Sequence, residues 1–359
     1  MITQNPPSSQ IKVLVVEDSL TVQQLLVGIV TGEPDMTVIG TARNGEEALS
    51  LAKRLHPDVV TMDVNMPVMD GLEATRYLMR DAPTRIIIVT SNVDRHDIDL
   101  SFEALRIGAL AVVPKPGLSN PDSARQLVSA IRTMSKVNVV RIWFRGQRTG
   151  TLSPNVLAMA QLRSNPTSSR LRFVRVVGIA ASTGGPAAVA TVLSALTPRF
   201  PVPILLVHHI TEGFSAGLVS WLSQQTPLKV KLAEDKEPAR PGTVYLAPQG
   251  SHMQINTKGY LELVSEPPLR GHRPSADYLF HSMANSYDKA SIGILLTGMG
   301  MDGAEGLDAM HRAGALTVAQ DEDSCVVYGM PAAAVQRGCV DISLDPERIG
   351  QMLRSLEPA

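Results

Sequence analysis

Over the first third of the chain, five short apolar runs rich in β-branched residues alternate with segments of helical periodicity. The runs lie at residues 11–16, 37–42, 58–62, 85–89 and 111–113. Helical patterns fall between them, at 20–30, 45–54, 72–79 and 97–107. This alternation is typical of βα units, and five of them predict a small, doubly wound parallel sheet.

Polar side chains lie just after four of these predicted strands. Glu17 and Asp18 follow the first strand, Asp63 the third, Thr90 the fourth and Lys115 the fifth. The carboxyl ends of parallel strands share one edge of a sheet, where ligands bind, so we expect these groups to converge. Three carboxylates, a hydroxyl and a lysine suit Mg²⁺ with an attached phosphoryl group. Any one of them alone is more simply explained as a helix cap or a solvated charge.

The motifs at these positions resemble the response-regulator receiver family. They are VEDS at 16–19, DVNMPVMDG at 63–71, TS at 90–91 and KP at 115–116. The resemblance covers about residues 11–134. It implies that Asp63 accepts a phosphoryl group from a sensor histidine kinase and that Glu17 and Asp18, with Asp63, hold Mg²⁺. Thr90 and Lys115 would then contact the phosphoryl group.

Charge divides the chain into three regions. Residues 1–134 and 173–359 each carry a net charge of −4, whereas residues 135–172 contain seven basic and no acidic residues. The middle region lacks sustained periodicity, so we interpret it as a basic linker between two domains. Its charge fits either solubility or docking of an acidic partner, and the sequence favours neither.

The third region also places polar residues after apolar strands. Predicted strands at 174–180, 203–207 and 291–296 lead to Ser182, to His208 and His209, and to Asp302. If the strands are parallel, a nucleophile, a base and an orienting acid meet at one edge in a second, larger α/β domain.

Other interpretations of these residues stay open from spacing alone. Ser182 and Asp302 fit plain helix caps, and glycine-rich turns often bind phosphate or a dinucleotide without catalysis, as in a signalling adaptor. However, no lysine follows the glycines as in a P-loop, and the spacing is not GxGxxG. The serine also lacks the flanking glycines of GxSxG, which disfavours the common α/β-hydrolase fold.

Six longer motifs over residues 173–345 resemble the chemotaxis receptor methylesterase family. They are VGIAASTGGP at 177–186, HITEGF at 209–214, APQGSHM at 247–253, GHRPSAD at 271–277, LLTGMGMDGA at 295–304 and AQDEDSCVVYGMP at 319–331. The resemblance implies that Ser182 is the nucleophile, His209 the base and Asp302 the acid that orients the histidine. By the same resemblance, Thr183 and the Met299 backbone correspond to the family residues that contribute to stabilising the oxyanion.

Three further histidines need separate interpretation. His208 precedes the expected base, and in a strand its side chain points to the opposite side. His252 and His272 lie in matching motifs, where a structural or substrate-lining role is the simpler expectation. The sequence after His209 is Ile-Thr-Glu, where the family often has Met-Pro-Pro, which bears on substrate preference.

The combined resemblance implies a phosphorylation-activated response regulator. It would hydrolyse glutamyl methyl esters in the cytoplasmic domain of chemoreceptors and release methanol through an acyl-enzyme, with possible glutamine deamidation. The esterase site would need no cofactor. In the family, the unphosphorylated receiver covers the esterase cleft and phosphorylation loosens it.

Composition excludes several other classes of protein. A net charge of −1 argues against electrostatic binding of nucleic acid, and no basic DNA-reading helix is found. Residues 1–7 lack the features of a signal peptide. The 23 uncharged residues at 176–198 are interrupted by STGGP, which predicts a strand, turn and helix instead of a membrane span. Two cysteines support neither a disulfide framework nor a zinc cluster. We therefore expect a cytoplasmic protein without membrane insertion.

Overall fold

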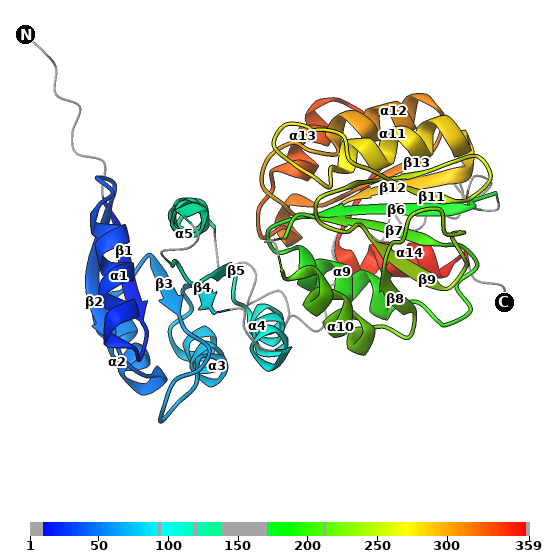
Figure 1. The fold of residues 1–359 in the computed structure, drawn as a ribbon. Helices are drawn as coiled ribbons and strands as arrows, with labels where there is room; N and C mark the ends of the chain where they lie inside the picture. Colours follow the sequence, from blue (N-terminus) through cyan, green and yellow to red (C-terminus); the bar gives the residue numbers. More distant parts are fainter. Residues whose placement is uncertain are drawn as a thin grey trace, which may run out of the picture. The chain divides into compact units, whose positions relative to one another are not determined.

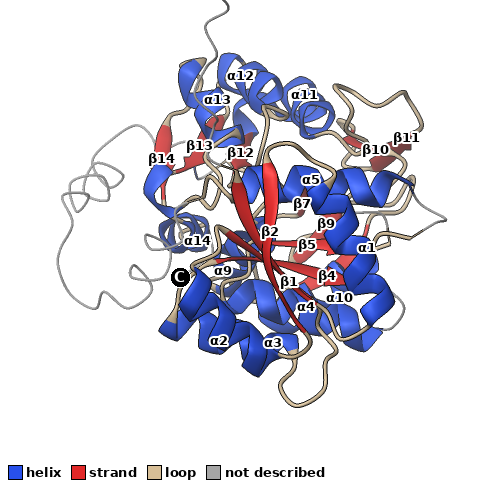
Figure 2. Ribbon diagram, turned by 90° about the vertical axis from the view of Figure 1, so that its left-hand side faces the viewer, coloured by secondary structure: helices blue, strands red, loops and turns tan. Residues whose placement is uncertain are grey.

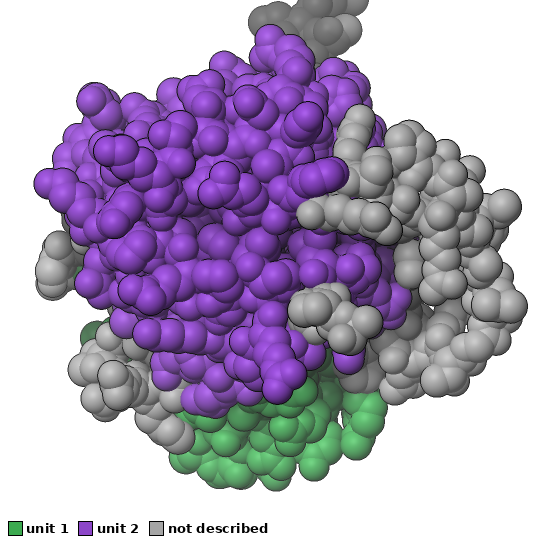
Figure 3. Space-filling view, turned by 90° about the vertical axis from the view of Figure 1, so that its right-hand side faces the viewer, with its two compact units in different colours: residues 1–147 green, residues 148–359 purple. Residues whose placement is uncertain are grey.

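The computed structural model describes residues 10–91, 95–117, 121–137, 171, 173–210 and 213–356. It divides into two compact units, residues 1–147 and 148–359 (Figure 3), which are described separately. Most of the predicted basic linker, residues 135–172, lies outside the described residues. Its limits therefore stay a prediction.

The first unit is built on a five-stranded parallel sheet with the order β2-β1-β3-β4-β5. Each strand is followed by a helix (Figure 1). The strands are β1 (Ile11–Val16), β2 (Met36–Ala42), β3 (Val59–Met62), β4 (Arg85–Thr90) and β5 (Ala111–Pro114). The helices are α1 (Leu20–Thr31), α2 (Gly45–Leu55), α3 (Gly71–Asp81), α4 (Arg95–Ile107) and α5 (Pro121–Met134). The predicted doubly wound receiver fold is confirmed.

Local sequence explains where two of these helices begin. The Asn44 side chain accepts a hydrogen bond from the Glu47 amide at the start of α2. Asp70 does the same for the Glu73 amide at the start of α3. Such caps satisfy amides that have no partner within the helix. Between the helices, β3 is buried along its whole length, as expected for a parallel strand covered on both faces.

The second unit contains a seven-stranded, fully parallel sheet with the order β14-β13-β12-β6-β7-β9-β8. Its strands are β6 (Val176–Ala181), β7 (Ile204–His208), β8 (Lys229–Leu232), β9 (Thr243–Leu246), β12 (Ser291–Leu295), β13 (Leu316–Gln320) and β14 (Ile342–Leu344). A separate antiparallel hairpin joins β10 (His252–Ile255) to β11 (Leu261–Val264). The three strands predicted to carry the triad are adjacent and parallel, with β6 between β12 and β7.

Helices cover both faces of this sheet. Figure 1 shows α11, α12 and α13 on one side and α9, α10 and α14 on the other, and Figure 2 shows β13 and β14 at the left, with α13 above them and α14 below. The helices are α9 (Gly185–Ser194), α10 (Ser215–Gln225), α11 (Ala276–Tyr287), α12 (Ala304–Arg312), α13 (Met330–Gln336) and α14 (Pro346–Arg354). The expected larger α/β domain is thus confirmed.

One glycine sets how closely α11 approaches the sheet. A Cβ on Gly178 of β6 would lie 2.5 Å from the Met283 sulfur and 3.0 Å from the Phe280 ring, both on α11. A side chain at this position would therefore require the Met283 and Phe280 side chains to shift. The approach matters because the first residues of α11 contact the candidate active site.

The uncharged stretch at 176–198 forms β6, a turn and α9, as predicted. Pro186 lies in the first turn of α9, where its missing amide hydrogen costs nothing. Among the described residues, no helix combines the length and the apolar character needed to cross a membrane.

Candidate active site

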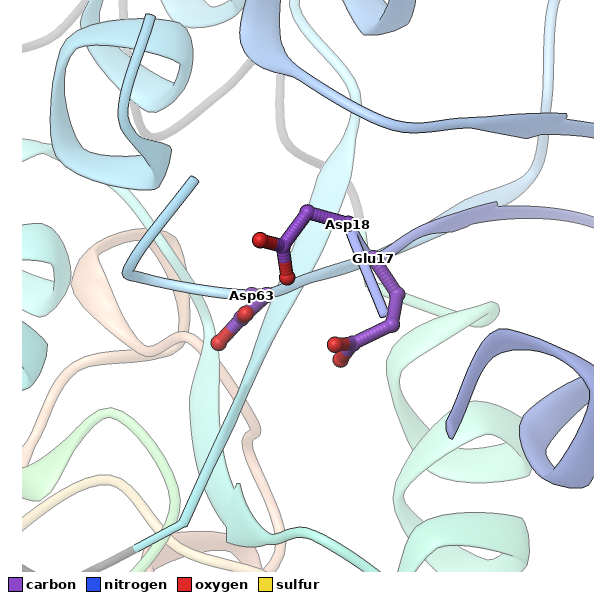
Figure 4. Close-up of side chains that lie close together, drawn as sticks. All are labelled: Glu17, Asp18 and Asp63. Atoms are coloured by element: carbon purple, nitrogen blue, oxygen red, sulfur yellow. The ribbon is translucent and has the colours of Figure 1, made fainter. Parts of the chain in front are cut away.

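The acidic residues predicted in the first unit lie together at the carboxyl edge of its sheet. Glu17 and Asp18 follow β1, and Asp63 follows β3. One carboxylate oxygen from each lies within 4.8 Å of the other two. Figure 4 shows the three side chains grouped around one space. Asp63 and Glu17 are buried, while Asp18 is half-buried.

Lys115 neutralises part of this negative charge. Its Nζ lies 2.9 Å from Asp63 Oδ2 and 2.9 Å from Glu17 Oε2. Burial raises the pKa of both carboxyls, although the Lys115 hydrogen bond opposes the shift. Burial would lower the pKa of Lys115, but the two carboxylates raise it above its usual value. Thr90 is buried at the end of β4, and its carbonyl accepts the Lys115 amide at 2.7 Å.

In the second unit, a histidine and an aspartate form the centre of the candidate site. His209 Nε2 lies 2.8 Å from Asp302 Oδ2, although the two residues are 93 positions apart. The His209 side chain is 10% exposed and Asp302 1% exposed. The other ring nitrogen, Nδ1, is buried without a hydrogen-bond partner among the described residues. One nitrogen thus faces the acid, and the other is available for a proton.

The Asp302 carboxylate accepts hydrogen bonds from the start of α11. Its Oδ1 accepts from Ser275 Oγ at 2.6 Å and from the Asp277 amide at 3.2 Å, and its Oδ2 accepts from the Ala276 amide at 2.7 Å. Burial would raise the pKa of Asp302, but the hydrogen bonds from His209, Ser275 and Ala276 hold it well below its usual range. The group is therefore ionised at neutral pH.

Ser182 directly follows β6, the strand that lies between the strands leading to these two partners. β6 and β7 pair Ala181 with His208, so Ser182 and His209 are the next residues along two adjacent strands. Adjacent strands lie about 4.8 Å apart. The His209 amide also donates to the Ala181 carbonyl at 3.0 Å, which continues the pairing to this point. Serine, histidine and aspartate are thus gathered at one sheet edge.

The turn that presents Ser182 is held by the loop after β12. The Ser182 amide donates to the Thr297 carbonyl at 3.0 Å, and Thr297 Oγ1 donates to the Thr183 carbonyl at 3.0 Å. Gly184 has φ of 74°, a backbone conformation that favours glycine. Met299 lies on the same loop after β12, and half of its surface is exposed (50%).

The other histidines have distinct surroundings. His208 is buried, and burial together with the neighbouring His209 lowers its pKa to about 3, so it is neutral. The His272 ring stacks on His209 with a centroid distance of 4.0 Å and an interplanar angle of 7°. His252 is buried and accepts the Ser275 amide at Nδ1, 3.2 Å away. His252 therefore contacts Ser275, one of the residues that bind Asp302.

Comparisons with known proteins match a family to each of the two units. The CheB methylesterase family model matches residues 177–353, and the response regulator receiver domain model matches residues 13–131. A Myxococcus xanthus protein, "Protein-glutamate methylesterase/protein-glutamine glutaminase 4", is 49% identical over 331 residues, which are 90% of this chain and 91% of that protein. The chain belongs to the CheB methylesterase family.

Two more CheB relatives extend the comparison. A "Protein-glutamate methylesterase/protein-glutamine glutaminase" of Nitrosospira multiformis is 42% identical over 96% of this chain and 97% of that protein. The crystal structure of the Thermotoga maritima CheB methylesterase catalytic domain matches with a TM-score of 0.50 and 34% identity, over 51% of this chain and 98% of that domain. This CheB family member therefore combines a receiver fold and a methylesterase fold in one chain.

Sequence reasoning missed two residues of this CheB site. Ser275 lies within the recognised motif GHRPSAD, but nothing in its spacing indicates that its hydroxyl reaches Asp302. Thr297 directly follows the apolar run of β12, much as Thr90 ends the run of β4, and that pattern could have identified it.

Proposed function

We propose that this chain is a phosphorylation-controlled protein-glutamate methylesterase acting on methyl-esterified glutamyl side chains in the cytoplasmic domain of chemoreceptors. The observation that carries the proposal is the 2.8 Å contact of His209 with Asp302, on the strand edge that also presents Ser182. The names of the relatives support the same activity. Such an enzyme works in the cytoplasm, where those receptor domains lie.

In this mechanism, Ser182 attacks the ester carbonyl carbon. His209 takes the hydroxyl proton at Nδ1, because its Nε2 faces Asp302. Backbone amides near Thr183 and Met299 stabilise the negative oxygen of the tetrahedral intermediate. The intermediate collapses to an acyl-enzyme, and the methoxy group leaves with the proton from His209 as methanol. Water then attacks, with His209 as the base, and releases glutamate and free Ser182.

The same steps allow glutamine deamidation, since an amide carbonyl forms the same acyl-enzyme and releases ammonia instead of methanol. Asp302 stays ionised throughout and stabilises the protonated His209. No step requires a cofactor in the esterase site. Because a positioned base contributes about 10²–10⁴-fold, loss of His209 should lower the rate by that factor.

The receiver unit regulates the activity of the esterase unit. Asp63 is the proposed acceptor of a phosphoryl group from a sensor histidine kinase, and Thr90 and Lys115 contact that group once it is attached. Glu17, Asp18 and Asp63 offer the carboxylate oxygens that Mg²⁺ prefers. Bound there, Mg²⁺ would offset the negative charge of the phosphoryl group. In the unphosphorylated state the receiver, joined through a linker at 135–172, inhibits the esterase.

The decisive experiment measures methanol release from methylated receptor membranes. The full chain is assayed with and without a small-molecule phosphodonor and Mg²⁺, and Ser182→Ala serves as the inactive control. We expect release that increases with the phosphodonor and disappears in Ser182→Ala. Release that persists in Ser182→Ala would refute the triad. No release from the wild-type chain under either condition would refute the esterase function and leave the C-terminal unit as a binding module.

A further inference from the structure

The residue at the N-cap of α11 does not cap its own helix. Ser275 has the extended backbone of an N-cap residue, but its side chain makes no cap hydrogen bond. Its hydroxyl instead donates to Asp302 Oδ1 at 2.6 Å. Asp302 takes over the capping role, because its carboxylate accepts the Ala276 and Asp277 amides, the first two of the helix.

We propose that Ser275 is a positioning residue for the esterase reaction, acting through Asp302 and His209; this inference rests on the proposed function. The hydroxyl is the shortest contact of Asp302 Oδ1, at 2.6 Å, and it restrains rotation of the carboxylate together with the Ala276 and Asp277 amides. With Oδ1 held in this way, Oδ2 stays directed at His209 Nε2, which lies 2.8 Å away. A rotated carboxylate would leave His209 without a fixed orientation relative to Ser182.

Burial makes the Ser275 hydroxyl difficult to replace. Ser275 and Asp302 are both buried, so solvent does not readily substitute for a lost donor. Hydrogen bonds to a charged group in such surroundings are stronger than those between neutral groups. Ser275 is the only side-chain hydroxyl bonded to Asp302 among the described residues.

A hydrogen bond to His252 holds the backbone of Ser275 in place. The Ser275 amide donates to His252 Nδ1 at 3.2 Å, so that nitrogen carries no proton. His252 Nε2 lies 3.1 Å from the Pro267 carbonyl, to which it donates. The ring also stacks on Tyr278 of α11 with a centroid distance of 3.9 Å. The tautomer and the ring plane of His252 are therefore both set, and the serine backbone is held relative to the helix.

The test compares two serine-to-alanine variants of the full chain. Ser275→Ala removes the donor to Asp302. Ser286→Ala is the matched control, because Ser286 is also on α11 and its hydroxyl donates to the Ile255 carbonyl at 3.0 Å, away from Asp302. The measurements are methanol release from a methyl-esterified receptor fragment over a range of pH, phosphonylation of Ser182 by a fluorophosphonate, and thermal unfolding.

We expect Ser275→Ala to lower kcat and the phosphonylation rate by about 10-fold to 100-fold with KM unchanged, since hydrogen bonds to charged groups are worth about that factor. The pH profile of kcat/KM should also change, because Asp302 loses one of the hydrogen bonds that stabilise its charge. Ser286→Ala should leave kcat and the pH profile unchanged.

The possible outcomes separate this inference from the proposed function. If wild type releases methanol and Ser275→Ala matches it in kcat and pH profile, the positioning role is wrong while the esterase function stands. Equal losses in both serine variants would also overturn the inference, because they would reflect stability alone. A wild-type chain that releases no methanol would refute the proposed function itself, whereas the phosphonylation rates would still report on Ser182 directly.

Discussion

Thr297 connects three loops through a single hydroxyl. Its Oγ1 donates to the Thr183 carbonyl at 3.0 Å, lies 3.2 Å from the Val327 carbonyl, and accepts the Val327 amide at 2.9 Å. Its own amide donates to Gln320 Oε1 at 2.8 Å. Since Thr183 follows the proposed nucleophile, this hydroxyl links the turn of Ser182 to the loop that precedes α13.

Thr297→Val keeps the shape of this side chain and removes the hydroxyl. We expect a loss of about 1–3 kcal/mol in the unfolding free energy of the second unit, because a buried amide and carbonyl lose their partner. Fluorophosphonate labelling of Ser182 should slow as well. Thr317→Val is the control, since Thr317 is buried on β13 and bonds to Asp341. It should lose stability but label at the wild-type rate; equally slow labelling in both variants would contradict the prediction.

His208 should make the second unit sensitive to acid. Its folded pKa of about 3 lies below the usual 6.5, so between these values the unfolded chain binds a proton that the folded chain does not. Stability should therefore fall as the pH drops below 6.5, with His208 contributing about 1.4 kcal/mol per pH unit. His208→Gln should flatten the pH dependence of urea unfolding between pH 6.5 and 4. Equal slopes in the two proteins would rule out this role.

At the scale of elements, the start of α11 binds Asp302, and α11 packs on β6 at Gly178. Gly178→Ala would place a methyl group 2.5 Å from the Met283 sulfur, so we expect Met283 and the helix that carries it to shift. We expect a loss of about 1–3 kcal/mol in unfolding free energy, typical of an overpacked core. Methanol release should also fall, because the helix start that binds Asp302 moves. Urea unfolding and initial rates check both effects, and an unchanged rate in a destabilised variant would show that the helix start stays in place.

The strands and the strand-end residues could be predicted from the sequence because both depend on local patterns. A parallel sheet brings the ends of its strands together, so the positions of Ser182, a histidine and Asp302 after three apolar runs group them if the strands are parallel, and the family resemblance selected His209 over His208. The contact of Ser275 with Asp302 could not be predicted in this way, since it depends on how α11 packs on β6. The hairpin of β10 and β11 was not predicted either, and it carries His252.

For the whole molecule, phosphorylation in the acidic pocket should change the rate of methanol release at the esterase site. Asp63→Asn removes the proposed phosphoryl acceptor, so the phosphodonor should no longer raise methanol release, while the unstimulated rate stays that of wild type. Removal of residues 1–134 should raise the unstimulated rate by about 5–150-fold, the range of typical allosteric couplings. Initial rates of the two variants and of wild type measure both effects. A truncated chain no faster than the full chain would refute inhibition by the receiver.

Because Asp302 caps α11, the proposed catalytic acid also takes part in holding the fold. The pKa of Asp302 is lowered in the folded state, so its charge stabilises the protein above the unfolded value of 3.8 and this stabilisation is lost as the pH falls below it. Active-site residues more often reduce stability in exchange for activity. Asp302 instead combines the proposed triad role with capping of α11. The same aspartate would serve the fold in a relative without hydrolytic activity, so its presence alone does not mark a relative as an active enzyme.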